Sequence, residues 1–219
     1  MANYDPEYFK DYKEQRFKWR FWGDYIKRYT NKEDPILEIG CTYGYLFKYL
    51  KNYSHKFGID VSEHAIKQAK ILNLGPEYKV MNAEKLDFKD KTFKVIIAID
   101  TLEHVRNPEK AIKEAARVLK EEGLFIMATP NPNAVSHKQK GKEWFAYKDK
   151  THISIHPAEY WEELLIKNDF RIKRRATIDL FDFPYANKFS QGINLLSYKL
   201  NIPFFKDIGD NTVIIAKKN

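Results

Sequence analysis

The stretch Ile36-Leu37-Glu38-Ile39-Gly40-Cys41-Thr42-Tyr43-Gly44-Tyr45, followed by Gly58-Ile59-Asp60, decides the fold of this chain. Its pattern predicts an apolar strand, a glycine-containing turn, a helix, a second strand and an acid at the end of that strand. Asp60 lies 20 residues after Gly40. At this spacing a carboxylate can accept hydrogen bonds from ribose hydroxyls in α/β nucleotide-binding folds. The stretch therefore predicts a nucleoside ligand.

The turn lacks the residues of a dinucleotide site. A G-x-G-x-x-G turn needs a second glycine two residues after the first, so that backbone amides can approach a diphosphate, but Thr42 holds that position. Tyr45 stands where a small residue is needed. Glu38 would repel a phosphate but attract an ammonium or a sulfonium. S-adenosylmethionine carries both cations and no phosphate, so it is the expected cofactor, and an NAD-dependent oxidoreductase is disfavoured.

Five segments in order resemble the class I S-adenosylmethionine-dependent methyltransferases, most closely the small-molecule branch that includes ubiquinone- and menaquinone-biosynthesis methyltransferases. The similar segments are residues 37–44, 58–62, 82–86, 93–105 and 117–124, with Pro130-Asn131-Pro132 after them. The similarity spans residues 36–178. It departs from the family pattern at Glu38, Thr42, Asn82 and Glu121, where Asp, Gly, Asp and Pro are usual.

The resemblance implies a site for S-adenosylmethionine and for its product S-adenosylhomocysteine. The matching cofactor-binding positions are Glu38, Gly40, Cys41, Thr42, Gly44, Tyr45, Asp60, Val61, Asn82, Ala83, Glu84, Ile99, Asp100 and Thr101. N-terminal helices of resembling proteins close over the methionine end of the cofactor, which adds Tyr8, Tyr12 and Arg16. Cys41 is expected to pack beside the turn and not to act as a nucleophile.

The remaining pattern predicts an α/β fold, with a Rossmann-like, doubly wound sheet of seven strands and helices on both faces. Strands are expected at 35–39, 56–60, 78–82, 93–99, 124–129, 170–178 and 212–217, and helices at 45–52, 63–72, 108–120 and 157–168. By resemblance the last strand is antiparallel and the other strands are mostly parallel. An N-terminal helical segment, residues 1–34, precedes the methyltransferase domain, residues 35–219. Asp5 and Pro6 are expected to begin that helix, with an apolar stripe at Tyr8, Tyr12, Trp19, Trp22, Ile26 and Tyr29.

Two inserts, near residues 131–155 and 179–210, interrupt the alternation and are rich in aromatic residues. Loops of this length are uncommon without a function. Because both follow late strands, they are expected to form a small lid over an acceptor pocket at the carboxyl edge of the sheet. A helical cap with its own core, or a dimer contact, is the alternative.

Methyl transfer from a sulfonium is an in-line displacement, so a base is needed only when the acceptor carries a proton of high pKa. His104, after the fourth strand, and His152, in the first insert, are the catalytic candidates. The alternative for each is a structural role. Asp100, Glu103 and His104 lie close together, but Glu103 and His104 are ordinary in the family's loop. No metal is therefore expected.

Composition agrees with a cytoplasmic enzyme of one domain. The chain has 219 residues, 43% of them hydrophobic, a single cysteine and no apolar run of the length that crosses a membrane.

The net charge is +8, with basic clusters at 138–142 and 171–175. These clusters are interpreted as solvated surface, so nucleic acid is not an expected partner. The expected acceptor is a small molecule, and the chain is expected to be a monomer or homodimer. An RNA or protein methyltransferase, or a cofactor-binding protein that works through a partner without catalysis, stays open.

Overall fold

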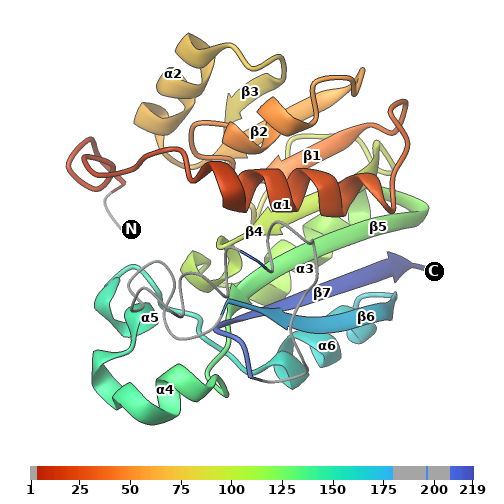
Figure 1. Cartoon of the computed structure of the whole chain (residues 1–219). Coiled ribbons are helices and arrows are strands. Elements are labelled where there is room, and N and C mark those ends of the chain that lie inside the picture. Colours follow the sequence, from red (N-terminus) through yellow and green to blue (C-terminus); the bar gives the residue numbers. More distant parts are fainter. Residues whose placement is uncertain (1–3, 180–195, 197–207) are drawn as a thin grey trace.

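The computed structural model describes residues 4–179, 196 and 208–219, and within them it contains a seven-stranded sheet with helices on both faces (Figure 1). The strands are β1 (Ile36–Ile39), β2 (Lys56–Asp60), β3 (Glu77–Val80), β4 (Phe93–Ile99), β5 (Leu119–Pro130), β6 (Phe170–Ile178) and β7 (Asn211–Lys218). The helices are α1 (Arg16–Lys27), η1 (Tyr45–Tyr49), α2 (Glu63–Leu72), η2 (Leu102–His104), α3 (Pro108–Val118), α4 (Val135–Lys140), η3 (Gly141–Glu143), α5 (Phe145–Lys148) and α6 (Ala158–Lys167), where η marks a 3-10 helix.

The strand order is β3-β2-β1-β4-β5-β7-β6. Strands β1 to β5 pair in parallel, and β7 lies antiparallel between β5 and β6. The expected α/β fold, with its antiparallel last strand, is confirmed. The order reverses between β1 and β4, and the crevice at such a point receives ligands at the carboxyl ends of the strands. The fold therefore places the site beyond β1, β2 and β4.

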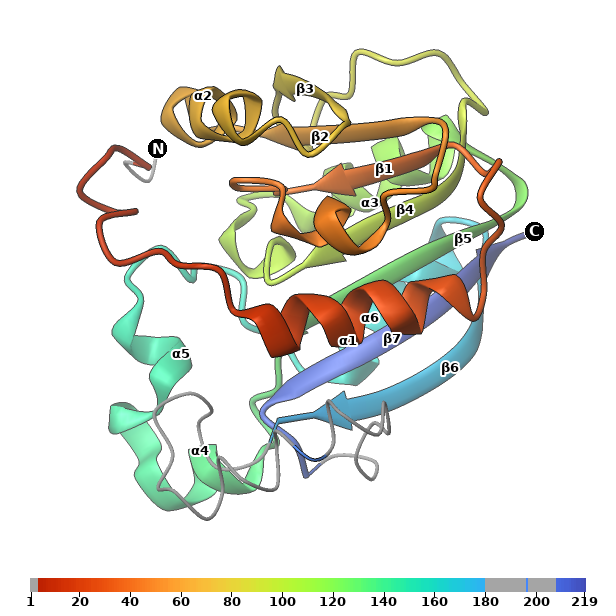
Figure 2. The ribbon, with the colours of Figure 1, turned by 45° about the horizontal axis from the view of Figure 1, so that its top comes forward.

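Each face of the sheet is covered by its own apolar cluster. Helix α1 lies across one face (Figure 2), where Trp22 and Ile26 are fully buried against β1, β4, β5 and β7. Helices α3 and α6 cover the opposite face through Ile112 and Trp161, which are also fully buried. Burying each of these side chains contributes about 1.5–3 kcal/mol. The two layers make the sheet a rigid platform for the residues at its edge.

The first helix begins at Arg16 and not near Pro6, so the expected N-terminal helix is partly wrong. Residues 4–15, here called the N-terminal arm, contain turns at 6–11 and otherwise run without regular secondary structure. The Asp5 carboxylate accepts the backbone N–H groups of Glu7 and Tyr8, which caps a single turn. The aromatic residues of the arm pack at the edge of the sheet and not on its face. Phe9, for example, is 5% exposed and stacks on His64.

Other boundaries also differ from expectation, among them the start of β5, which lies at Leu119 and not at residue 124. The helix expected at 45–52 is the short η1, because Gly44 enters it in a left-handed conformation (φ +76°) and the helical bonding ends before Leu50. Helix α3 ends at Val118, because Leu119 has an extended backbone conformation and begins β5. Strand β3 ends at Val80, so Asn82 lies in the loop beyond it.

The first insert folds into α4, η3 and α5 around a small core of Ala134, Trp144 and Ala146. We call residues 131–155 the cap. Most of the second insert, residues 180–195 and 197–207, lies outside the described residues. None of the helices in the described ranges is long and apolar enough to cross a membrane.

Candidate cofactor and acceptor site

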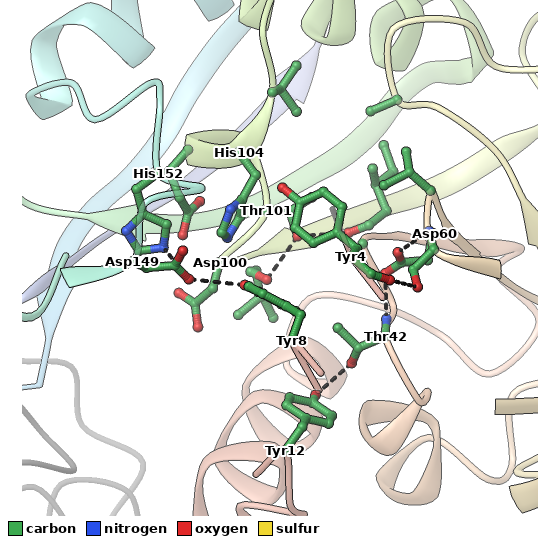
Figure 3. A pocket seen from close by; sticks show the side chains of 18 of the residues that line it. Tyr4, Tyr8, Tyr12, Thr42, Asp60, Asp100, Thr101, His104, Asp149 and His152 are labelled. Atoms are coloured by element: carbon green, nitrogen blue, oxygen red, sulfur yellow. Dashed lines mark hydrogen bonds and ion pairs between the residues drawn. The ribbon is translucent and has the colours of Figure 1, made fainter. Parts of the chain in front are cut away.

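A cavity of about 900 Å³ lies at the carboxyl ends of β1, β2 and β4, between the N-terminal arm, the sheet edge and the cap (Figure 3). The sequence-predicted residues in its lining are Tyr8, Tyr12, Gly40, Thr42, Asp60, Val61, Asn82, Ala83, Glu84, Ile99, Asp100, Thr101, His104 and His152. Five other predicted residues are not in its lining: Arg16, Glu38, Cys41, Gly44 and Tyr45. The fold thus gathers residues from six separate stretches of the chain around one space.

The turn after β1 is held by the carboxylate at the end of β2. Asp60 Oδ2 accepts the backbone N–H of Thr42 at 3.0 Å, and Asp60 Oδ1 accepts that of Ser62 at 2.9 Å. Burial raises the pKa of Asp60, against the lowering effect of these backbone N–H groups. A carboxylate has about four lone-pair sites, so Asp60 can still accept hydroxyl donors from a ribose in the cavity.

Gly40 and Thr42 adopt left-handed conformations, with φ of +72° and +46°. A Cβ on Gly40 would lie 2.3 Å from Thr101 Oγ1, which packs against the turn from the end of β4. Contact with Thr101 therefore explains why glycine is needed at position 40, even without a ligand in the cavity. Thr42 has the conformation that glycine favours, and its hydroxyl is bonded to Tyr12 Oη at 2.6 Å.

Glu38 lies beneath the turn and is 2% exposed. Burial, and secondly the charge of Asp60, raises the pKa of Glu38 well above its usual value. Cys41 is buried beside it, and burial likewise raises the pKa of its thiol. A thiol with a raised pKa is a poor nucleophile, which agrees with the packing role expected for Cys41.

The N-terminal arm bridges the cavity. On the β2 side, Ser62 Oγ donates to the backbone carbonyl of Tyr4 at 2.7 Å, while Tyr12 bonds with Thr42. On the opposite side, Tyr8 Oη donates to Asp149 Oδ2 in the cap at 3.0 Å (Figure 3). The arm and the cap therefore meet over the cavity.

His104 and His152 lie side by side, with ring centroids 4.6 Å apart. The Thr151 hydroxyl donates to Asp149 Oδ1 at 2.6 Å and lies 2.8 Å from His104 Nδ1. Because a hydroxyl carries one hydrogen, Thr151 must accept here, which assigns the proton of His104 to Nδ1. Burial, and secondly the neighbouring His152, lowers the pKa of His104 to about 4. The neutral ring then has a free lone pair on Nε2.

His152 is oriented in the same way. Its Nδ1 lies 2.7 Å from the backbone carbonyl of Ala146, an acceptor, so Nδ1 is the donor. Its Nε2 lies 3.8 Å from Asp149 Oδ2. Asp149 therefore faces the arm, Thr151 and both histidines. It was not among the residues predicted from sequence.

Among the charged side chains that line the cavity, acidic residues outnumber basic ones, although the chain as a whole has a positive net charge. Its acidic members are Asp60, Glu63, Glu84, Asp100, Glu103, Asp149 and Asp179, and its basic members are Lys13, Lys18 and Arg106. Asp100, at φ +49°, forms an ion pair with Lys18 from α1. The excess of acidic side chains in the lining suits a ligand with positive charge, such as the sulfonium and ammonium of S-adenosylmethionine.

Several lining residues were missed in the sequence. Tyr4, Phe9 and Lys18 come from the arm and α1, and Asp149 and Ile153 come from the cap. No local pattern marks them, because they reach the site only through contacts between distant segments. Glu103 was noticed only as part of a familiar loop, and the structure buries it completely.

A sequence profile described as a methyltransferase domain matches residues 12–174, which is most of the chain. An uncharacterized protein of Methanocaldococcus jannaschii is 31% identical over 179 residues, covering 80% of this chain and 83% of its own length. A ubiquinone biosynthesis O-methyltransferase of Parvibaculum lavamentivorans is 33% identical over 107 residues, covering 47% of this chain and 42% of its own length. The chain thus spans less than half of that relative, and of another uncharacterized M. jannaschii protein it spans 47%.

Solved structures share the fold. A SAM-dependent methyltransferase from Archaeoglobus fulgidus superposes with a TM-score of 0.71 at 18% identity, covering 99% of this chain and 100% of that one. One from Thermotoga maritima, described as a possible histamine N-methyltransferase, gives 0.71 at 22% identity, covering 97% and 95%. The profile match over most of its length shows that the chain belongs to the methyltransferase domain family, and its fold is shared with these solved SAM-dependent methyltransferases.

Proposed function

We propose that this enzyme methylates a small molecule that binds between the cofactor and the histidine pair. The observation that carries the proposal is the bridge from Tyr8 to Asp149, since it joins the arm to the cap above the cavity. A cavity of about 900 Å³, bridged by the arm and the cap, has the size of a site for a cofactor and a compact acceptor. A polymer would need an open groove.

The two ends of the cavity have different roles in this proposal. Asp60 and the turn at Gly40 hold the ribose and methionine portions of S-adenosylmethionine, as the family resemblance implies. The acceptor then lies near His104 and His152. The leaving thioether is neutral, so the protein contributes mainly by holding the acceptor in line, which can be worth roughly 7–11 kcal/mol.

A proton on the acceptor hydroxyl or amine must leave during transfer. The Nε2 lone pairs of His104 and His152 are the nearest acceptors for it in this proposal, with Nδ1 of each ring already used as a donor. Thr151 and Asp149 would then be positioning residues that fix the ring of His104. Relatives named ubiquinone biosynthesis O-methyltransferases support an oxygen as the methylated atom.

The alternative of an RNA methyltransferase has less support. The acidic lining would repel phosphates. The basic residues at 171–175 are largely engaged: Arg171 pairs with Glu122, Arg175 pairs with Glu159 and Glu162, and Arg174 donates to Tyr29. We assign the enzyme to the cytoplasm as a monomer or homodimer, in keeping with a single, buried cysteine.

A transfer assay tests the proposal. The enzyme is incubated with methyl-labelled cofactor and, separately, a small-molecule extract, total RNA and total protein. We expect label in the small-molecule fraction, and much less label at sub-saturating cofactor when Asp60→Asn replaces the natural chain. Mass spectrometry of the labelled product identifies the methylated atom. Labelling of RNA or protein that persists at 200 mM salt, about where counterion release weakens non-specific contacts, with none in the extract, would overturn it.

A further inference from the structure

Glu103 is a buried carboxyl group that methyl transfer does not use. It lies in η2 at the end of β4, is fully buried and lines the cavity. Neither of its carboxylate oxygens has a hydrogen-bond partner among the described residues. The backbone carbonyl of Glu103 accepts the N–H groups of Ile153 and Ser154, at 2.9 and 2.8 Å, so the cap holds this residue in place. A buried carboxyl group without a partner is costly, so a ligand that satisfies it would stabilise the fold.

Two nitrogen ligands lie beside that carboxyl group. Glu103, His104 and His152 each offer one ligand atom, and these three atoms lie within 4.8 Å of one another. Both histidines have Nδ1 engaged, with Thr151 and with the carbonyl of Ala146. Such second contacts fix the rings of metal-ligating histidines and leave Nε2 for the ion. Asp149 supports this arrangement through Thr151.

We propose that Glu103, His104 and His152 bind a divalent transition-metal cation at the acceptor end of the cavity. Two imidazoles and one carboxylate are donors suited to Zn²⁺, Mn²⁺, Fe²⁺ or Co²⁺, and not to the all-oxygen preference of Ca²⁺. With bonds of about 2.0–2.2 Å at tetrahedral angles, the ligand atoms of one ion lie roughly 3.3–3.6 Å apart. Side-chain rotations that bring these atoms up to about 1 Å closer together would therefore close the site on an ion.

The site faces the cavity and leaves coordination positions open to it. An ion held there would occupy Nε2 of both histidines and so replace their proposed role as bases: it would lower the pKa of a bound acceptor hydroxyl, whose proton would leave to solvent. This role rests on the proposed function, whereas the site itself does not. The proposal departs from the expectation of no metal drawn from the sequence, where Glu103 and His104 were interpreted only as residues of a common loop.

Metal binding can be measured without activity. Purified enzyme is stripped with a chelator and titrated with Co²⁺, followed by visible absorption, and with Zn²⁺ by calorimetry, each with and without S-adenosylhomocysteine. We expect one equivalent to bind. Glu103→Gln and His152→Gln should each weaken binding at least tenfold. His156→Gln is the matched control, because His156 stacks on Tyr160 away from the cavity lining.

Two further measurements make the outcome unambiguous. Circular dichroism confirms that each variant is folded, and if Glu103→Gln does not fold, His152→Gln carries the test. Affinity for S-adenosylhomocysteine should be retained in both site variants, so loss of the metal site is separable from failure of the proposed function. Absence of saturable binding to the natural chain, or equal binding by the site variants and the control, would overturn the proposal.

Discussion

The two ends of the cavity are assembled from different kinds of contact. At the cofactor end, Asp60 bonds the backbone of Thr42, 18 residues away, and that of Ser62, two residues away. At the acceptor end, Tyr8 reaches Asp149 across 141 residues. The first end is a property of a short stretch of sequence, whereas the second exists only after the arm, the sheet and the cap have come together.

The two ends of the cavity differ in the energy of their contacts as well as in how readily the sequence predicts them. The cofactor end uses backbone groups and positive φ values, which tolerate few substitutions. The acceptor end uses side-chain bonds between partly exposed groups, each worth about 0.5–1.5 kcal/mol. We therefore expect single substitutions to have larger effects at the cofactor end. The first three of the following four predictions test that ranking, and the fourth concerns an ion pair outside the cavity.

Gly40→Ala should have the largest effect. The new Cβ would lie 2.3 Å from Thr101 Oγ1, and Gly40 has φ +72°. Overlap and strain together should lower the free energy of unfolding by about 2–4 kcal/mol. Gly141→Ala is the matched control, since Gly141 has φ +53° and a Cβ added there would meet no described atom within 4 Å. Denaturant unfolding of both variants measures the steric part, and equal losses would show that the Thr101 contact relaxes freely.

Asp60→Asn should come next, and its effect is measured as affinity for the cofactor product. It removes the charge-assisted bonds to the ribose, worth about 1.5–3 kcal/mol, or roughly ten- to hundredfold in affinity. Calorimetry with S-adenosylhomocysteine measures this effect. Asp87→Asn serves as the control, because Asp87 is exposed and outside the cavity lining. Similar affinities for the two variants would remove Asp60 from the ribose site.

Tyr8→Phe tests the acceptor end with a smaller expected effect. It deletes the hydroxyl that bonds Asp149 and leaves the ring, so S-adenosylhomocysteine should dissociate about two- to tenfold faster. Stopped-flow fluorescence gives the rate. Tyr147→Phe, an exposed tyrosine of the cap outside the cavity lining, should leave the rate unchanged. A rate for Tyr8→Phe equal to that control would mean that the arm does not retain the ligand.

Glu114→Gln should have the smallest effect, and that effect should depend on pH. Hydrogen bonding from Arg117 holds the pKa of Glu114 below its usual range, and Leu86 N–H also donates to it. Because the folded-state pKa is depressed, the carboxylate stabilises the fold above its unfolded pKa of about 4.3 and loses that effect as the pH falls. The variant should be about 0.5–1 kcal/mol less stable at pH 7.

The difference between Glu114→Gln and the natural chain should shrink when unfolding is repeated near pH 3. Glu163→Gln, at an exposed position of α6, is the control and should match the natural chain at both pH values. A difference that is independent of pH would show that shape and not charge matters at Glu114.

The sequence predicted most of the sheet, because alternating apolar runs and caps such as Ser62 and Asn107 act locally. It also predicted the turn and Asp60, whose spacing is fixed by one β-α-β unit. It failed in the N-terminal arm, where Phe9 and Tyr12 pack on Tyr43 and so override a helical stripe. Asp149 and Thr151 could not be found, since their partners Tyr8 and His104 are 141 and 47 residues distant. Residue type alone did not show that Glu103 is buried without a partner.

The arm that lies on Thr42 and Ser62 also governs the order of events in turnover. Its tyrosines form one wall of the space that an acceptor would occupy, and they lie over the turn that would hold the cofactor. We therefore expect the cofactor to load while the arm is displaced, and the acceptor chamber to be complete only afterwards. Steady-state kinetics should be compulsory-order, with S-adenosylhomocysteine released last and competing with S-adenosylmethionine but not with the acceptor.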